Sequence, residues 1–306
     1  MGINRNNNFR NLTINDKANY WPYGGTFFSS PTGRFSDGLL VPDFLAMKLK
    51  IPLWKPYLAS GGEHEFLHGA KFAGGGSAAL GDLGIPGRKV ATVLKQSLGD
   101  MEAKKLLMEA VYAFSIGTND YASFAKTYPF ANATKQQEYV HMVIGKLTDV
   151  IKEIYKIGGR KFAMHNVGPW GCMPRLRQYF GLSNNKCHDG LLTIARMHND
   201  ALSNAAMEIE SQLAGFKYLI FDVYNSALIR IERFKESIIA YRGNNCGIEP
   251  YELCSNPNDH IFFHGAHPTE HCYKQMARLI WEGGPNVTKP YNMKQLFALE
   301  VKDIEN

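Results

Sequence analysis

The chain lacks the features that define a membrane, fibrous or multidomain protein. Its 306 residues contain no apolar run near the ~20 residues that a membrane-spanning helix needs. No long Pro/Gly/Ser linker, charge block or internal repeat interrupts it. The first residues, MGINRNNNFRNLTINDK, have no apolar core and do not read as a signal peptide. With 45% hydrophobic residues, the sequence predicts one globular domain over residues 1–306.

Concentrated charge of one sign is also missing. The formal net charge is +6, but the Lys and Arg residues are scattered along the chain. The densest groups, Lys104–Lys105 and Arg175 with Arg177, are typical of solvated helix or loop faces. Because nucleic-acid binding normally needs a basic stripe or patch, we expect no nucleic-acid partner.

Cysteine is scarce, and its spacing excludes one kind of site. No Cys-x-x-Cys occurs, which argues against a zinc or redox centre of that type. The count of five leaves at least one thiol unpaired within the chain. Short separation favours bonds between Cys172 and Cys187 and between Cys246 and Cys254, although sequence does not fix connectivity. The alternative is a set of buried free thiols in a cytosolic protein.

Three Asn-x-Thr sequons occur, at Asn11, Asn132 and Asn286. In a secreted protein such sequons are surface glycosylation sites, although short motifs also arise by chance. The three asparagines are therefore candidates whose use depends on the compartment of the protein.

Short apolar segments alternate with longer amphipathic ones. Three segments are typical of strands covered on both faces: VYAFSI (111–116), KFAMHNV (161–167) and KYLIFDVY (217–224). Apolar periodicity predicts helices over 134–155, 191–213 and 268–281. This alternation predicts an α/β fold with a parallel sheet wrapped by helices. In such sheets the active site lies at the carboxyl ends of the strands.

Local signals predict where the helices begin and end. Thr134-x-x-Gln137 is a capping-box pattern that predicts the start of the first helix, and Gly158–Gly159 predict its end. Pro268 fits the first position of the last helix.

Two loop segments carry residues suited to chemistry. In SIGTND, Asn119 follows a strand end, where its amide either donates to an oxyanion or belongs to an Asn-Asp turn. The glycines of AGGGSAAL either expose backbone N–H groups to a ligand or form a flexible turn. Gly75-x-Ser77-x-Ala79 lacks the last glycine and the preceding strand of a nucleophile elbow.

Four histidines lie in the segment DHIFFHGAHPTEH: His260, His264, His267 and His271. Because Pro268 is expected to start a helix, His271 does not share a face with the first two. No Cys or carboxylate is placed to complete a ligand shell, so we expect no metal and no cofactor. We interpret His271 as an ordinary residue on the face of the helix.

Together the motifs resemble the plant GDSL esterase/lipase family of the SGNH hydrolase superfamily. The similar segments appear in the family's order over nearly the whole chain: NYWPYGGTFFSSPTGRFSDGLLVPDFLA, GAKFAGGGSAAL, FSIGTNDY, GPWGCMPR, DHIFFHGAHPTE and PYNMKQLF. The resemblance implies a three-layer α/β/α sandwich with a flavodoxin-like parallel sheet. It also implies two-step hydrolysis of carboxylic esters through an acyl-serine.

The resemblance assigns roles to individual residues. His267 matches the catalytic general base, while the backbone N–H of Gly75 and the side chain of Asn119 match two oxyanion donors. The substrate it implies is a small-molecule or lipid ester. The family and the sequons also favour secretion or passage through the secretory pathway.

Departures from the family pattern bear on activity. The family's Gly-Asp-Ser precedes its Asn run by a few residues; here that run starts at Asn6, so the serine would precede Met1. No Gly-Asp-Ser occurs in the chain, and the central strand that should carry it is missing. His264 stands where the family has the Asp that orients the base, and a histidine supplies no negative charge. Segments 84–93 and 234–253 are shorter than the family's, which affects the substrate cleft.

Two functions remain open. The first is an ester hydrolase whose nucleophile lies upstream, which the sequons of a secreted parent favour. The second is a non-catalytic binding or scaffold protein on the same fold, with a protein as its partner. His264 favours the second, because truncation does not explain a replacement near the C-terminus.

Overall fold

The computed structural model describes residues 18–57, 66–74, 76–80, 85–182, 186–233, 241–242 and 252–300. The chain divides into two compact units built from segments distant in sequence. The sheet unit comprises Ala78–Trp170, Asp189–Ser226 and Ile280–Asn306, and the histidine unit comprises Met1–Ser77, Gly171–His188 and Ala227–Leu279. The single domain over residues 1–306 stays a prediction.

A four-stranded sheet with the order β1-β2-β3-β6 forms the centre of the sheet unit. Its strands are β1 (Val111–Phe114), β2 (Lys161–His165), β3 (Lys217–Phe221) and β6 (Thr288–Pro290). The first three run parallel, with Ala163 paired to both Ala113 and Leu219, and β6 is antiparallel to β3. The three predicted strands are confirmed, although each ends two or three residues earlier than expected.

Burial differs sharply across this sheet. β2 is buried along its whole length, and β3 is buried at every position except Lys217. β1, at the edge of the described sheet, is only half-buried, and Ala113 is exposed. β1 therefore has the apolar composition of an inner strand in the setting of an outer one.

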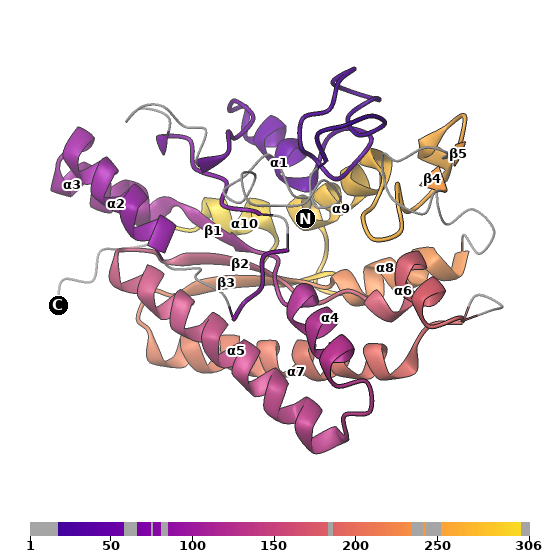
Figure 1. Cartoon of the computed structure of the whole chain (residues 1–306). Helices are drawn as coiled ribbons and strands as arrows, with labels where there is room; N and C mark the ends of the chain where they lie inside the picture. The colour runs from indigo at the N-terminus through magenta and orange to yellow at the C-terminus, as the bar shows by residue number, and fades with distance from the viewer. Residues whose placement is uncertain are drawn as a thin grey trace. The chain divides into compact units, whose positions relative to one another are not determined.

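Helices cover both faces of the sheet, as Figure 1 shows. α5 (Ala133–Lys156) and α7 (Asp189–Gln212) pack against each other on one side, and α10 (Met293–Ala298) contacts β2 and β3 on the other. Side chains at helical spacing form the buried stripe of α5: Val140, Val143, Ile144, Leu147, Val150 and Ile151. This is the three-layer α/β/α arrangement that the resemblance implied.

Three further helices belong to the sheet unit: α2 (Ile85–Leu98), α3 (Asp100–Glu109) and α4 (Thr118–Thr127). A search of the helices in the described part of the chain finds none with the length and apolar character of a membrane span.

Two predicted helix starts are wrong, and both errors have local causes. α5 begins at Ala133 because Asn132 is its N-cap, with Oδ1 accepting the N–H of Lys135 at 2.9 Å. The helix predicted from Pro268, α9 (Glu270–Glu282), starts after that proline, which instead forms an antiparallel bridge with Phe262. The hydroxyl of Thr269 then accepts the N–H of Cys272, as an N-cap side chain does.

The histidine unit has little regular structure of its own. It contains α1 (Val41–Leu49), α6 (Pro174–Tyr179), most of α8 (Val223–Arg233) and α9, and the hairpin of β4 (Tyr241–Arg242) and β5 (Glu252–Leu253). Its core holds a cluster of buried residues: Ala18, Tyr23, Phe35 and Phe263.

The structure contains one of the two predicted disulfides, and the other stays a prediction. Cys172 and Cys187 are bonded, and the backbone N–H of His188 donates to Gly171 O across the same loop. Cys254 has a free thiol in the described structure and packs against the Tyr23–Phe263 cluster. Its expected partner, Cys246, lies outside the described residues.

A buried ion pair anchors the chain just before α1. Arg34 donates from Nε and Nη2 to the two carboxylate oxygens of Asp43 at 2.8 and 2.9 Å. Burial alone would raise the pKa of Asp43, but the bonds from Arg34 and the charge of Lys71 lower it below 3.8. The Nζ of Lys71 is buried and makes no hydrogen bond to a described residue, and burial lowers the pKa of this amine to about 8. Asp43 thus faces two buried cations.

Replacing Asp43 by Asn should lower the free energy of unfolding by about 3–5 kcal/mol, because it strands two buried cations. The depressed pKa means that this stabilisation is present above the ordinary carboxyl pKa and is lost as pH falls through the folded-state value. Urea unfolding at neutral pH measures it. Glu153→Gln, which breaks an exposed pair with Arg88, is the control and should leave the midpoint unchanged. Equal losses in both variants would contradict the assignment.

Candidate functional site

The segment 261–269 of the histidine unit folds back on itself and brings two histidine rings together. Phe263 N–H donates to the carbonyl of His267 at 2.9 Å, and Thr269 N–H donates to the carbonyl of Ile261 at 3.0 Å. This tight turn places Nδ1 of His267 2.7 Å from Nε2 of His264. His264 is buried and His267 is half-buried. The two residues that the resemblance singled out are therefore hydrogen-bonded partners.

Aromatic rings from the N-terminal part of the histidine unit enclose this pair. Phe35 stacks on His267 with ring centroids 4.7 Å apart, and Tyr23 meets His264 edge-on at 5.7 Å. The apolar walls remove water from both imidazoles, which disfavours their charged forms.

The surroundings keep both rings neutral. Burial, together with the positive charge of Arg175, lowers the pKa of His264 well below 6.5 and that of His267 to about 3. Between two neutral rings, one N–H donates and the other nitrogen accepts. If His267 donates from Nδ1, its Nε2 keeps a lone pair, which is the tautomer that a general base needs.

Arg175 supports the turn through its backbone as well as its charge. At the start of α6 its N–H donates to the carbonyl of Gly265 at 2.9 Å. A Cβ at position 265 would lie 2.9 Å from the Cβ of Arg175, so glycine permits this close approach.

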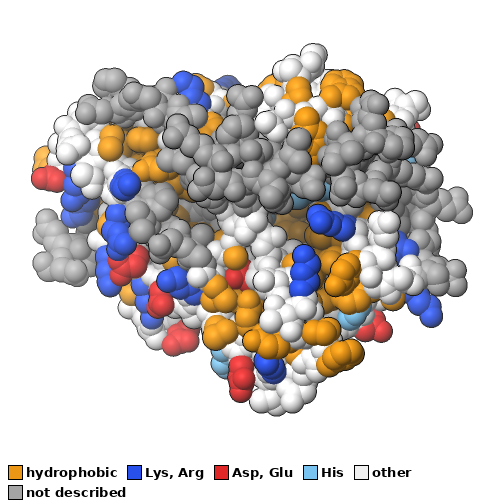
Figure 2. All heavy atoms as spheres, in the orientation of Figure 1, with side chains coloured by type: hydrophobic (Ala, Val, Ile, Leu, Met, Phe, Trp, Pro, Cys, Tyr) orange, Lys and Arg blue, Asp and Glu red, His pale blue; other side chains and the backbone are white. Residues whose placement is uncertain are grey.

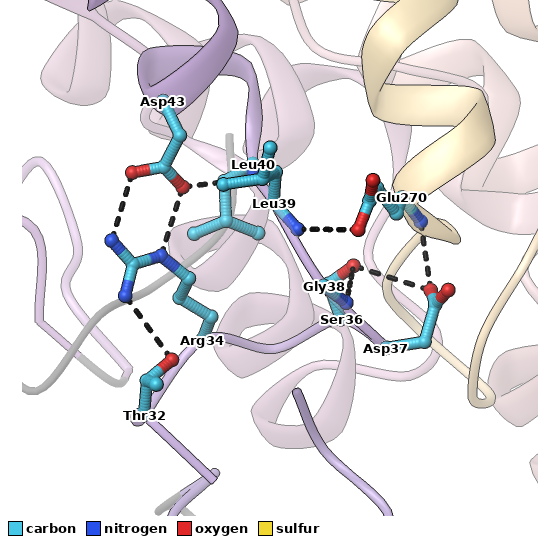
Figure 3. A network of polar contacts seen from close by, with 9 residues as sticks. All are labelled: Thr32, Arg34, Ser36, Asp37, Gly38, Leu39, Leu40, Asp43 and Glu270. Atoms are coloured by element: carbon cyan, nitrogen blue, oxygen red, sulfur yellow. Dashed lines mark hydrogen bonds and ion pairs between the residues drawn. The ribbon is translucent and has the colours of Figure 1, made fainter. Parts of the chain in front are cut away.

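The helix that follows His267 is tied to residues 36–39, as Figure 3 shows. The N–H of Glu270 donates to Oδ1 of Asp37 at 2.8 Å, and the carboxylate of Glu270 accepts the N–H of Leu39 at 3.0 Å. A Cβ at Gly38 would lie 1.6 Å from Oε2 of Glu270, so a larger residue there would displace this carboxylate from Leu39. The carboxylates of Asp37 and Glu270 thus fix the beginning of α9.

The second predicted locus lies in the sheet unit, at the carboxyl end of β1. Gly117 has φ +116°, and a Cβ there would approach His198 and Val167 at 3.2 Å, so the turn into α4 needs glycine. Asn119 is the second residue of α4. Next to it, Asp120 is buried and accepts the N–H groups of Ala79 and Leu80 at 2.7 and 3.0 Å.

The predicted residues are thus found in two settings. His264 and His267 meet in the histidine unit, and Asn119 starts α4 in the sheet unit. Gly75 lies outside the described residues. Convergence of Gly75, Asn119 and His267 in one cleft stays a prediction.

The remaining histidines of the cluster have other roles. His271 lies on the exposed side of α9, where its Nε2 is 2.7 Å from the side-chain amide of Gln275, as its interpretation as a helix-face residue requires. The carbonyl of His260 accepts the hydroxyl of Thr269. Within the described ranges, no three His, Cys, Asp or Glu side chains gather as metal ligands would.

Sequence reasoning missed three carboxylates that support these loci: Asp37, Glu270 and Asp120. Asp120 had a signal, because it follows Asn119 at a helix start. Asp37 and Glu270 lie in RFSDG and HPTE, but no local pattern links residues 233 positions apart.

The three-layer fold of the sheet unit defines an α/β protein, and the histidine turn lies in a segment that resembles a loop of the GDSL esterase family. A family model described as GDSL-like Lipase/Acylhydrolase matches residues 13–280. The chain is 39% identical over 329 residues to GDSL esterase/lipase 1 of Arabidopsis thaliana, covering 96% of this chain and 87% of the relative. It is 40% identical over 323 residues to a GDSL lipase of Tanacetum cinerariifolium, covering 95% and 84%.

The chain therefore belongs to the GDSL lipase/acylhydrolase family. Another relative is named an inactive GDSL esterase/lipase-like protein 25, from Arabidopsis thaliana. It is 33% identical over 300 residues, covering 92% of this chain and 69% of the relative.

Replacing His264 by Asp should raise the pKa of His267 above its value of about 3, because a carboxylate beside Nδ1 favours the imidazolium. NMR titration of the imidazole carbon-bound protons measures this pKa. His271→Asp, on the exposed side of α9, is the control and should leave His267 unchanged. An unchanged His267 in the His264→Asp variant would show that residue 264 does not govern its protonation.

Proposed function

We propose that the protein carries the base and the oxyanion donors of a GDSL-type ester hydrolase, and that the chain as given does not turn over esters. The supporting observation is the 2.7 Å contact between His267 and His264 in the loop that resembles the family's base loop. His267 is the general base, and Gly75 and Asn119 are the oxyanion donors. No Gly-Asp-Ser nucleophile is found in the sequence.

His264 performs half of what a carboxylate would do in this position. As a neutral acceptor it holds His267 in the tautomer that leaves Nε2 free. It supplies no negative charge to stabilise the imidazolium that forms when a base takes a proton. The pair thus orients a base but leaves it without a carboxylate to offset burial, which together with the charge of Arg175 lowers the pKa of His267 to about 3.

The acyl-accepting serine belongs, on this proposal, to a strand that pairs with the outer edge of β1. β1 is half-buried and lies at the edge of the described sheet, although its apolar residues suit an inner position. A parallel strand beside it would end at the same edge of the sheet as the turn that precedes Asn119.

The substrate class that fits this site is a small-molecule or lipid ester. Acyl transfer to serine and then to water needs only the base, the nucleophile and the oxyanion donors, and no metal or redox cofactor. On the face drawn in Figure 2, basic side chains are interspersed with apolar and acidic ones, which favours a small ligand over nucleic acid.

The alternative function is a non-catalytic binding or scaffold protein on the same fold, with a protein partner. The replacement of the orienting acid by His264 favours it, and a relative that is named inactive gives a precedent for such a member. The two functions differ in whether the missing groups, once supplied, produce turnover.

As given, the chain should not measurably hydrolyse short p-nitrophenyl esters. An N-terminal extension supplying a strand that ends in Gly-Asp-Ser, combined with His264→Asp, should produce turnover. Either change alone should fall short, because loss of the orienting acid costs ~10⁴-fold in serine proteases and such groups act as a unit. The measurement is kcat/KM for all four chains.

The same extension ending in Gly-Asp-Ala is the matched control for this experiment. Full activity from the extension alone would remove the argument that His264 weakens the base. Turnover by the chain as given that is abolished by Ser77→Ala would identify Ser77 as a nucleophile. An inactive doubly changed chain that folds normally would favour the binding function.

We also propose that the protein passes through the secretory pathway. The Cys172–Cys187 disulfide is typical of oxidising compartments. Asn132 is exposed, and its cap bond to Lys135 uses Oδ1 rather than the Nδ2 that would carry a glycan. Asn286 is also exposed, but Thr288 of that sequon is buried and bonded to Gly283. Asn11 lies outside the described residues.

When secreted from a eukaryotic host behind a signal peptide, the protein should carry a glycan at Asn132. Thr134→Ala should remove that glycan, seen as a loss of mass, while it keeps the Asn132 cap of α5. Thr134→Ser keeps the sequon and is the matched control. Identical masses for the Ala and Ser variants would exclude Asn132 as a glycosylation site.

A further inference from the structure

We propose that Asp37 is a positioning residue for His267, acting through the first turn of α9 rather than by touching the imidazole. The functional consequence rests on the proposed role of His267 as the base. The claim that Asp37 positions the imidazole does not depend on that role, and every contact involved lies within the histidine unit.

The backbone N–H groups at the start of α9 need hydrogen-bond partners from outside the helix. The first N–H groups of a helix have no partner within the helix, and they form the positive end of its dipole. Glu270, the first residue of α9, donates its N–H to the carboxylate of Asp37 at 2.8 Å. A carboxylate is the preferred partner there, because its charge and its hydrogen bond act together. Asp37 therefore holds the turn of chain that directly follows His267.

A second hydrogen bond joins the same two segments in the opposite direction. The carboxylate of Glu270 reaches back to the N–H of Leu39 at 3.0 Å, so each segment supplies the carboxylate that the other's backbone needs. Figure 3 shows these bonds crossing between the helix and residues 36–39. Moving α9 relative to this segment would break both bonds at once, so the pair acts as a clamp.

The side chain of Asp37 is itself held in place by burial and by two hydroxyl groups. Its side chain is 2% exposed, and it accepts the hydroxyls of Thr26 at 2.7 Å and Ser36 at 3.3 Å. A buried carboxylate held by several donors has one favoured orientation, and losing a donor is costly. Residues outside α9 therefore help to hold the carboxylate of Asp37 in its orientation.

The two bonds between Asp37, Glu270 and Leu39, called the clamp, are linked to the imidazole of His267 through Phe35. Phe35, two residues before Asp37, stacks on the ring of His267, which lies three residues before Glu270. Residues 35–39 thus hold the ring through Phe35 and the helix after it through Asp37. Loosening the helix start leaves the ring free to slide on Phe35, and the 2.7 Å bond to His264 depends on that placement.

The test uses NMR of the imidazole nitrogens in the full chain, because these signals report the tautomer of His267 and its bond to His264. In Asp37→Ala we expect loss of the hydrogen-bonded Nδ1 proton signal and a mixture of tautomers. Asp37→Asn retains one acceptor oxygen and should restore the signal in part. Thr26→Val removes one donor to Asp37 but keeps the bond between Asp37 and the N–H of Glu270, so it should alter the His267 signals less than Asp37→Asn does.

A stability loss in Asp37→Ala with unchanged His267 signals would show a structural role only, and would overturn the proposal. If Asp37→Ala does not fold, the comparison of Asp37→Asn with Thr26→Val decides. Asp37→Asn must then alter the His267 signals more than Thr26→Val does, and equal effects would overturn the proposal.

A second measurement separates this proposal from the proposed function. In the chain with both the extension and His264→Asp, Asp37→Asn should lower kcat by up to roughly 10²-fold with little change in KM, since small misplacements of a base have effects of that size. An inactive extended chain with altered His267 signals in Asp37→Asn would refute the ester hydrolase and leave the positioning role intact. An active extended chain whose kcat ignores Asp37→Asn would overturn the positioning role.

Discussion

The histidine site depends on one interaction: the hydrogen bond from the backbone N–H of Glu270, in the first turn of α9, to the buried carboxylate of Asp37. It satisfies a backbone N–H that the helix leaves free, and it does so from 233 residues away. Because Glu270 returns a bond to Leu39, the N-terminal segment and the base-bearing loop define each other's positions. Arg34, which precedes this segment, and Asp43, in the first turn of α1, form a buried ion pair that also holds the segment in place. The loop's precision comes from this frame, since the loop has little regular structure itself.

The neutral histidine pair follows from the same packing. Phe35 and Tyr23 exclude water from the imidazoles, and Arg175 adds a positive charge nearby. The sequence alone indicated only that His264 supplies no negative charge to His267. In the structure burial keeps His264 neutral, so it orients rather than repels. What the His264–His267 pair lacks relative to an Asp–His pair is therefore the negative charge and not the hydrogen bond.

Sequence reasoning succeeded where the physical signal was local or where whole motifs matched. Strands β1 to β3 were found because their residues are mostly apolar, and the family was found by the order of its matching segments. It failed at the start of α5, where Asn132 competes with Thr134 as the cap. It also missed Asp37 as the partner of Glu270, because no periodicity links distant segments. Cys254 was assigned by short separation alone, and its packing against aromatic rings is not visible in spacing.

His264 also changes what it costs to fold this site. An aspartate at 264 would be a buried charge that needs a protonated His267 or several donors to compensate it, and desolvating charges is expensive. Two neutral imidazoles sharing one hydrogen bond avoid that penalty and still fill the same space. If His267 is the base, as proposed, a histidine at position 264 lowers the cost of folding the loop at the expense of basicity, the usual direction of a trade-off between stability and activity. On this argument the oriented ring can be retained whether or not the protein still cleaves esters, because the frame set by Asp37 does not depend on the charge at position 264.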